Sequence, residues 1–322
     1  MIIPKIDKNK LQAPFPYFGG KSKIAFIVWE AFGDVKTYTE PFFGSGAVLL
    51  GRPNYNYTNQ IEIICDSDGY ICNVWRALQF APDEVAKYCD WPVNHIDSTV
   101  RRNKLIEDEE YLLRNLLNDD EWYNSKLAGY WIWLASCWIG GGITSGNKIY
   151  KLGQIPNLIK LTGVHKLSIR FNAEEDSKQV TEPYNLNIYT WFRELSERLR
   201  YTQVVCGDWS RVCGGNWQDT RGIVGMFFDP PYSHSIGRDN NLYHHDNDVT
   251  KEVETWCLER GKKESYRIVL AGYEGEYEVL EKEGWLIKTW KSQGGYSNQN
   301  KTKNLNRYRE RLWFSPHCLK IS

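Results

Sequence analysis

Two neighbouring stretches decide the fold: TYTEPFFGSGAVLL (residues 37–50) and IEIICDSDGYICNVWRALQ (residues 61–79). Each begins with an apolar or β-branched run that predicts a strand, continues through a polar or glycine-containing loop, and ends with apolar residues at helical spacing. Two strand–loop–helix units in succession indicate a parallel sheet with helices on its faces.

The same pattern extends outward in both directions. Before it, two glycines break the chain and a helix is expected over about residues 24–32. After it, the pattern changes from about Pro82 to Asn185, where an acidic helical stretch precedes an aromatic run and a basic, glycine-containing segment. We therefore predict a catalytic domain formed by residues 1–81 and 186–322, and an inserted, mainly helical subdomain over residues 82–185.

The sheet pattern resumes after an amphipathic helix. Further strands are predicted in these segments: QVVCGDW (203–209), GIVGMFFDPPY (222–232) and RIVLAGY (267–273), with GWLIKTW (284–290) and RERLWFS (309–315) pairing as a hairpin. Three strands deliver an acid at or just past their carboxyl ends, namely Asp66, Asp208 and Asp229. Ligands bind at that edge of open α/β sheets.

Composition excludes several classes of protein. The hydrophobic content of 42% and charged content of 25% are ordinary for a soluble globular chain. No apolar run approaches the roughly 20 residues that cross a bilayer, and the N-terminus lacks the apolar core of a signal peptide. The eight cysteines form no C-x-x-C pair and no zinc-type spacing. We therefore expect a cytoplasmic protein with reduced thiols, no membrane attachment and no metal.

The glycine loop EPFFGSGAV (residues 40–48) suits a ligand that the backbone approaches closely, because glycine adds no side chain there. A tight packing turn or a dinucleotide site would also use such glycines, but the dinucleotide fingerprint needs a third glycine where the chain has Leu49. A carboxylate follows at Asp66, in a position suited to ribose hydroxyls. Together these features favour a nucleoside ligand without a pyrophosphate, such as S-adenosylmethionine. Glu40 would attract the cationic amino acid end of that ligand.

The segment FFDPPYS (residues 227–233) suits the binding of a planar amine. Two acceptors at fixed positions can draw an exocyclic amine such as that of adenine towards tetrahedral geometry, and the Asp229 carboxylate and the Pro230 carbonyl provide them. Pro230 and Pro231 restrict the backbone, and Tyr232 offers a flat face for stacking. A surface turn is the plain alternative, but the segment directly follows a buried strand.

The ordered set of motifs resembles the Dam-like D12 class, α group, of N6-adenine DNA methyltransferases, of the kind common in bacteriophages and prophages. The resemblance covers PFPYFGGK, EPFFGSGAV, CDSD, CGDWS, FFDPPYS and the tail RYRERLWFSPHCL. It implies a Rossmann-like, S-adenosylmethionine-dependent fold with a mostly parallel seven-stranded sheet, a target-recognition insertion, and methyl transfer to a flipped-out adenine of duplex DNA. The Arg- and Tyr-rich reading hairpin of Dam enzymes has no counterpart in this sequence, so a GATC specificity does not transfer.

The resemblance also implies roles for individual residues. The expected cofactor-binding residues are Tyr17, Gly20, Lys21, Glu40, Phe42, Gly44, Gly46, Asp66 and Asp208. The expected catalytic residues are Asp229, Pro230, Pro231 and Tyr232. Asp208 is expected to lie beside the cofactor adenine. The next residue is Trp209, where phenylalanine is commoner in the family.

The DNA-binding residues are expected outside the sheet. Trp131 and Trp133 are predicted to pack in the core, whereas Trp138 and Ile139, just before three glycines, suit a wedge that fills the space of a flipped base. The expected phosphate contacts are Lys148, Lys301, Lys303, Arg307 and Arg309, for which a merely solvated face is the alternative.

Two other functions stay open at this point. The same amine chemistry would serve RNA or the N4 atom of cytosine, and a DNA-binding module that has lost turnover would keep the fold. The intact Asp229 and glycine loop argue against the second. We expect duplex DNA as the partner and a monomer or weak homodimer.

Overall fold

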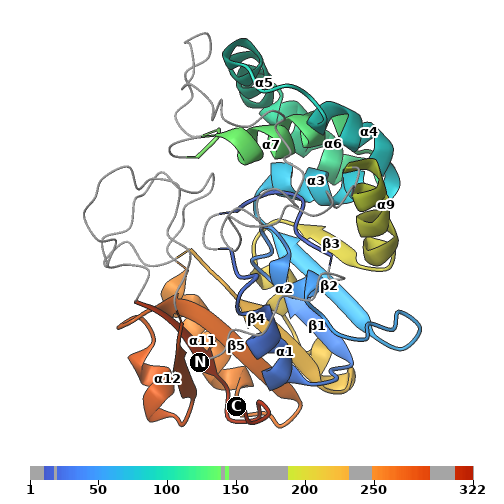
Figure 1. Cartoon of the computed structure of the whole chain (residues 1–322). Helices are drawn as coiled ribbons and strands as arrows, with labels where there is room; N and C mark the ends of the chain where they lie inside the picture. The colour runs from blue at the N-terminus through green and yellow to red at the C-terminus, as the bar shows by residue number, and fades with distance from the viewer. Residues whose placement is uncertain are drawn as a thin grey trace, which may run out of the picture.

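The computed structural model describes residues 11–17, 20–138, 142–144, 188–231, 249–290 and 309–321. Within them, seven strands form one sheet in the order β3-β2-β1-β4-β5-β7-β6 (Figure 1). The strands are β1 (Thr37–Glu40), β2 (Ile61–Asp66), β3 (Gln203–Cys206), β4 (Val224–Phe228), β5 (Tyr266–Tyr273), β6 (Leu286–Thr289) and β7 (Glu310–Phe314). Strands β1 to β5 pair in parallel, and β7 pairs antiparallel with both β5 and β6. The mostly parallel sheet and the C-terminal hairpin are both confirmed.

The helices of the described residues surround this sheet. They are α1 (Ala25–Phe32), α2 (Ala47–Leu50), α3 (Gly69–Phe80), α4 (Pro82–Cys89), α5 (His95–Glu107), α6 (Glu109–Asn118), α7 (Ser125–Cys137), α9 (Ile188–Leu199), α10 (Ser210–Cys213), α11 (Thr250–Arg260) and α12 (Glu278–Lys282), with a short 3-10 helix η1 (Trp217–Thr220). Asp68 begins α3 by accepting a hydrogen bond from the Tyr70 N–H at 2.8 Å, which is the usual N-cap arrangement.

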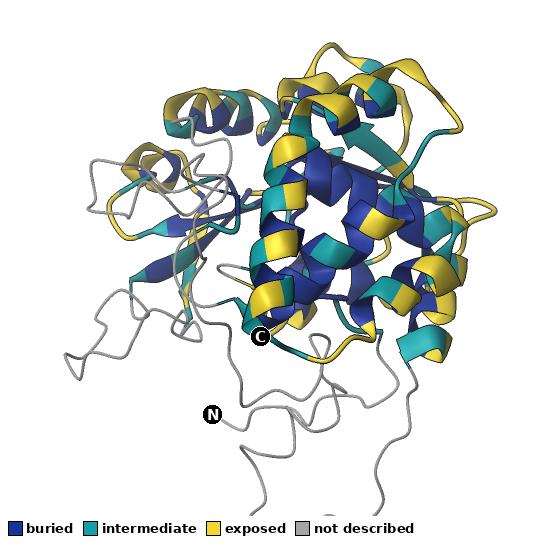
Figure 2. Cartoon of the chain, turned by 90° about the horizontal axis from the view of Figure 1, so that it is seen from above, coloured by how far each residue is buried: buried dark blue, intermediate teal, exposed yellow. Residues whose placement is uncertain are grey.

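Alternate residues of the inner strands enter two separate cores. Ile64, Phe227 and Val269 join the core beneath α1, α3 and α9, whereas Met226 and Ile268 join the core beneath α10, α11 and α12. Successive side chains of a strand point to opposite faces, so both faces of the sheet are covered by helices. Figure 2 shows the corresponding buried stripes on the helices, with exposed residues on their outer sides.

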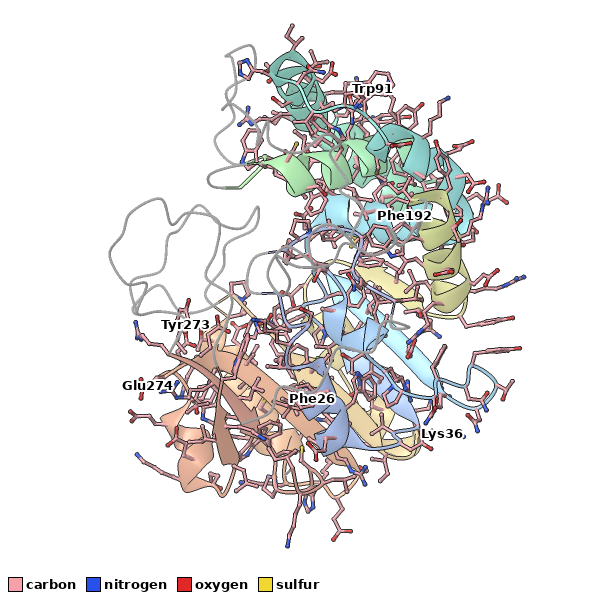
Figure 3. The ribbon with its side chains drawn as sticks, viewed as in Figure 1. Phe26, Lys36, Trp91, Phe192, Tyr273 and Glu274 are labelled. Atoms are coloured by element: carbon pink, nitrogen blue, oxygen red, sulfur yellow. The ribbon has the colours of Figure 1, made fainter. Side chains whose placement is uncertain are left out.

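Helices α4, α6 and α7 pack against α3, α4 also packs against α9, and α5 packs against α7, so that these helices share one core. Trp133 of α7 is fully buried, and Trp131 is nearly so, in agreement with the core role predicted for both. The ring of Phe192, from α9, is also fully buried in this helical layer (Figure 3). The division into residues 1–81 with 186–322 and residues 82–185 stays a prediction.

A buried cluster of charged side chains surrounds Glu62 of β2. Glu62, which is fully buried, accepts from Arg52 at 3.1 Å and from Arg198 at 2.7 Å. Thr202 donates a further hydrogen bond to the same carboxylate at 3.1 Å. A buried carboxylate is tolerated when its oxygens are paired in this way, so the cluster joins α9 to the sheet.

Candidate active site

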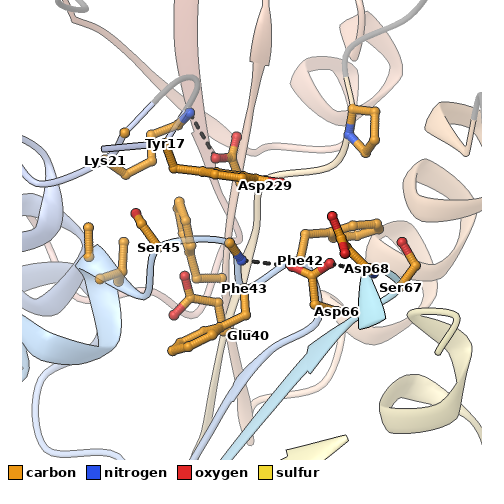
Figure 4. Close-up of a pocket in the computed structure, with 16 residues that line it drawn as sticks. Tyr17, Lys21, Glu40, Phe42, Phe43, Ser45, Asp66, Ser67, Asp68 and Asp229 are labelled. Carbon is orange, nitrogen blue, oxygen red and sulfur yellow. Dashed lines mark hydrogen bonds and ion pairs between the residues drawn. The ribbon is translucent and has the colours of Figure 1, made fainter. Parts of the chain in front are cut away.

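The carboxyl ends of β1 and β4 border a pocket. Strands β2 and β3 extend the sheet on one side of β1, whereas β4 and β5 extend it on the other side. The boundary between β1 and β4 is therefore the topological switch point, where α/β sheets bind ligands. The pocket contains about 690 Å³ of empty space, part of it open to solvent. Its lining includes all the predicted cofactor residues except Gly46 and Asp208, together with Asp229 and Pro231 (Figure 4).

The glycine loop is held in a conformation that favours glycine. Gly44 has φ of +51°, its N–H donates to Asp66 Oδ2 at 2.8 Å, and its carbonyl accepts from Trp75 Nε1 at 2.9 Å. A Cβ atom on Gly44 would lie 2.7 Å from the ring of Tyr17. Gly46, also in the left-handed region at φ +65°, ends the loop by preceding α2, which is only four residues long.

Asp66 joins β2 to the loop. The Asp68 N–H donates to Asp66 Oδ1 at 2.9 Å, so both carboxylate oxygens already accept a backbone N–H. Burial, and next the nearby Asp68 carboxylate, raise the pKa of Asp66 to about 7. The carboxyl group therefore changes its charge near neutral pH.

Glu40 forms the buried floor of the pocket at the end of β1. It is 2% exposed and accepts a hydrogen bond from the Tyr38 hydroxyl at 2.7 Å. Burial raises the pKa of Glu40 well above its usual value, and the Asp229 carboxylate adds to the effect, while the Tyr38 hydrogen bond opposes it. A cationic group entering the pocket would lower the energetic cost of ionising the desolvated Glu40 side chain.

Asp229 lies directly after β4 and is paired with Lys21. The Lys21 Nζ lies 2.8 Å from Asp229 Oδ2 and 3.9 Å from Glu310 Oε2, and also 5.7 Å from the centre of the Trp290 ring. Pro230 is buried and Pro231 is half-buried at the pocket wall, while Tyr232 lies outside the described residues. Figure 4 shows Lys21 and Asp229 on the opposite side of the pocket from Asp66 and Asp68.

The third predicted acid, Asp208, lies two residues beyond β3 and is exposed. Its Oδ1 atom accepts from the Ser210 N–H at 2.9 Å. The adjacent Trp209 ring stacks on Phe42, with centroids 6.2 Å apart and planes at 26°. The Trp209 Nε1–H is buried without a hydrogen-bond partner in the described part of the chain.

The predicted DNA-binding residues fall mostly outside the described residues, namely Ile139, Lys148, Lys301, Lys303 and Arg307. Trp138 follows the last turn of α7 and is half-buried, with the Arg102 guanidinium 6.0 Å from its ring centre. Arg309 lies just before β7, 5.4 Å from the centre of the Tyr273 ring. Their contacts with DNA stay predictions.

Sequence reasoning missed four polar residues of the site. Ser45, Ser67 and Asp68 line the pocket, and all three stood inside quoted motifs, where the Asp-Gly pair before a helical pattern was an available N-cap signal. Glu310 had no such signal, because only the pairing of β7 with β5 brings it next to Lys21.

The strand order and the acid-lined pocket at the switch point together define a Rossmann-like methyltransferase fold. The sequence model of the D12 class N6 adenine-specific DNA methyltransferases matches residues 17–293, and the chain belongs to this family. A comparison with curated proteins finds no match.

Membership of the family confirms the predicted activity. The protein is an adenine-specific DNA methyltransferase that transfers a methyl group from S-adenosylmethionine to the N6 atom of a flipped-out adenine. Among the described residues, no group of three or more His, Cys, Asp or Glu side chains is arranged to hold a metal ion. The described helices include none with the length and apolarity to cross a membrane.

Proposed function

We propose that Asp229, Pro230, Pro231 and Tyr232 hold the target adenine, and that the neighbouring pocket holds the methyl donor. The observation that carries this proposal is the position of Asp229, which lines one pocket together with the glycine loop and Asp66. Both acids therefore face one pocket, in which the methyl donor and the target amine would meet.

The Asp229 carboxylate and the Pro230 carbonyl would each accept one N–H of the adenine amine. Because Asp229 follows a fully buried strand and two prolines come next, both acceptors are rigid before the base arrives. S-adenosylmethionine, when bound, supplies an electrophilic methyl group. As the nitrogen acquires positive charge its protons become acidic, and Asp229 is the carboxylate within reach of one of them.

The pocket residues fit an adenosyl cofactor with an amino acid end. We propose that Asp66 accepts the ribose hydroxyls and that the desolvated Glu40 attracts the cationic amino group. Phe42 would contact the cofactor adenine, with the Trp209 ring packed behind Phe42 and Asp208 at the edge of the adenine. The raised pKa of Glu40 supports its assignment, because it marks a desolvated acid that a cationic ligand would stabilise.

We further propose that residues 82–185 read the target, with Trp138 and Ile139 entering the space of the flipped base. The end of α7 at Cys137 supports this, because the helix stops directly before Trp138 and the glycine run of the sequence. Lys148, Lys301, Lys303, Arg307 and Arg309 would contact phosphates, and their loss would weaken binding evenly across sequences.

The test is the Asp229→Ala variant, assayed with tritiated S-adenosylmethionine and DNA from a methylation-free host. We expect methyl transfer to fall by at least about 10³-fold, as for a group that contacts the reacting atoms, while the affinity for S-adenosylmethionine changes little. The matched control is Asp120→Asn, an exposed carboxylate between α6 and α7, which should keep full activity. Full activity of Asp229→Ala would refute the proposal.

A further inference from the structure

Lys21 is a buried cation with two carboxylates within reach. Its side chain is 5% exposed, and Nζ lies 2.8 Å from Asp229 Oδ2 and 3.9 Å from Glu310 Oε2. The Glu310 side chain is 6% exposed, whereas that of Asp229 is 21% exposed. Of the two acids, the one nearer to the ammonium is therefore also the one more open to the pocket.

Glu310 reaches this cluster from the far end of the sequence. It is the first residue of β7 and stands opposite Tyr273, the last residue of β5, in the antiparallel pair. This position lies beyond residues 17–293, which the family model matches. A carboxylate this deeply buried is costly unless it is paired, and the nearby Lys21 ammonium offsets part of that cost.

The arrangement creates a competition at Asp229. In the proposed function, on which this inference rests, the Asp229 carboxylate accepts an N–H of the target amine. In the structure, the Lys21 ammonium already contacts that carboxylate at 2.8 Å. An ammonium attracts the carboxylate more strongly than a neutral amine does, so the base enters productively only if Lys21 has another acceptor.

We propose that Glu310 is this acceptor, a positioning residue that draws Lys21 away from Asp229 when the target amine binds. A shift of Nζ by about 1 Å would shorten its distance to Glu310 Oε2 from 3.9 Å to the ~2.8 Å of an ordinary charged hydrogen bond. The four-carbon stem of lysine permits this shift without a backbone movement. The Lys21 carbonyl meanwhile stays fixed, because it accepts from the Ile24 and Ala25 N–H groups at the start of α1.

Glu310 also sets the charge of the cluster. Two carboxylates and one ammonium carry a formal charge of −1, whereas one carboxylate and one ammonium carry none. The amine nitrogen becomes positive as its new bond to carbon forms, and a fixed negative charge nearby stabilises that state. Both effects lower the barrier after DNA has bound, so they affect kcat rather than the affinity for DNA, which phosphate contacts dominate.

The test compares Glu310→Gln with Glu310→Asp in the full-length protein. The glutamine keeps the size and removes the charge, and we expect kcat to fall at least tenfold, a smaller loss than the ~10²–10³ that follows removal of a direct electrostatic contact. KM for DNA and Kd for S-adenosylmethionine should stay within about twofold, and Tm should change little because Asp229 still pairs with Lys21. Glu310→Asp should recover much of kcat.

The matched control is Glu274→Gln. Glu274 lies at the same end of the β5–β7 pair (Figure 3), but its side chain is 63% exposed and pairs with Arg311 at 2.9 Å. This variant should behave as the wild type. If Glu310→Gln also keeps full kcat while Asp229→Ala is inactive, the role of Glu310 is wrong and the proposed function stands. An active Asp229→Ala would instead overturn the proposed function. If kcat, cofactor affinity and Tm all fell together in Glu310→Gln, Glu310 would have a structural role only.

Discussion

The glycine loop offers a prediction whose magnitude follows from the structure. In Gly44→Ala, the new residue must adopt φ of +51°, which costs about 1–2 kcal/mol for a residue other than glycine. Its Cβ would also lie 2.7 Å from the Tyr17 ring, and relieving such overpacking costs about 1–3 kcal/mol. We expect the free energy of unfolding to fall by about 2–5 kcal/mol. We also expect S-adenosylmethionine binding to weaken at least tenfold, because both Gly44 and Tyr17 line the pocket.

The matched control separates the two costs. Gly215 has φ of +68°, but a Cβ there would meet no atom within 4 Å, so Gly215→Ala should cost only about 1–2 kcal/mol and leave cofactor binding unchanged. Urea unfolding followed by tryptophan fluorescence measures the stability, and titration calorimetry measures the affinity. In the background of Tyr17→Ala, the Gly44→Ala substitution should cost no more than Gly215→Ala. Equal losses for Gly44→Ala and Gly215→Ala in the otherwise wild-type protein would refute the reasoning.

Three further outcomes are expected. Glu62→Gln should lower the free energy of unfolding by about 3–5 kcal/mol in urea, because Arg52 and Arg198 lose their buried counter-charge; a loss below about 1 kcal/mol would contradict this. The pKa of Asp66 is raised to about 7, and only its ionised form accepts two hydroxyl donors, so S-adenosylmethionine should bind most tightly above pH 7 and up to tenfold more weakly per unit as pH falls below it. Asp66→Asn should remove this slope in calorimetric titrations. Trp131→Ala should lower the stability by about 3–5 kcal/mol, as measured by thermal unfolding, since its ring is buried against Phe15 at 4.7 Å.

Local patterns predicted much of the fold because each strand–loop–helix unit is complete within about 20 residues. Period and turn signals predicted β1, β2, α3, α9 and the β6–β7 pair. The three acids were also predictable, since a carboxylate after an apolar run marks the carboxyl end of a strand.

The remaining parts of the site depend on contacts between distant segments. The sequence carries no sign that Tyr17 covers Gly44, that Lys21 pairs with Asp229, or that Glu310 joins them. The contact of Glu310 arises from the strand order, which places β7 beside β5 rather than at the edge of the sheet, and the other two arise where the N-terminal segment meets the ends of β1 and β4. Residue patterns predict which edge of a sheet holds a ligand, but not which charges meet there.

The aromatic contacts around Tyr17 have a consequence for protein engineering. Tyr17 and Phe15 both contact Trp131 of α7, and Phe15 also contacts Trp75, whose indole N–H holds the Gly44 carbonyl. A chimaera that exchanges only residues 82–185 for those of a relative would cut through this set of rings. Hybrid enzymes with new sequence preferences should therefore carry the N-terminal segment and the insertion from the same parent.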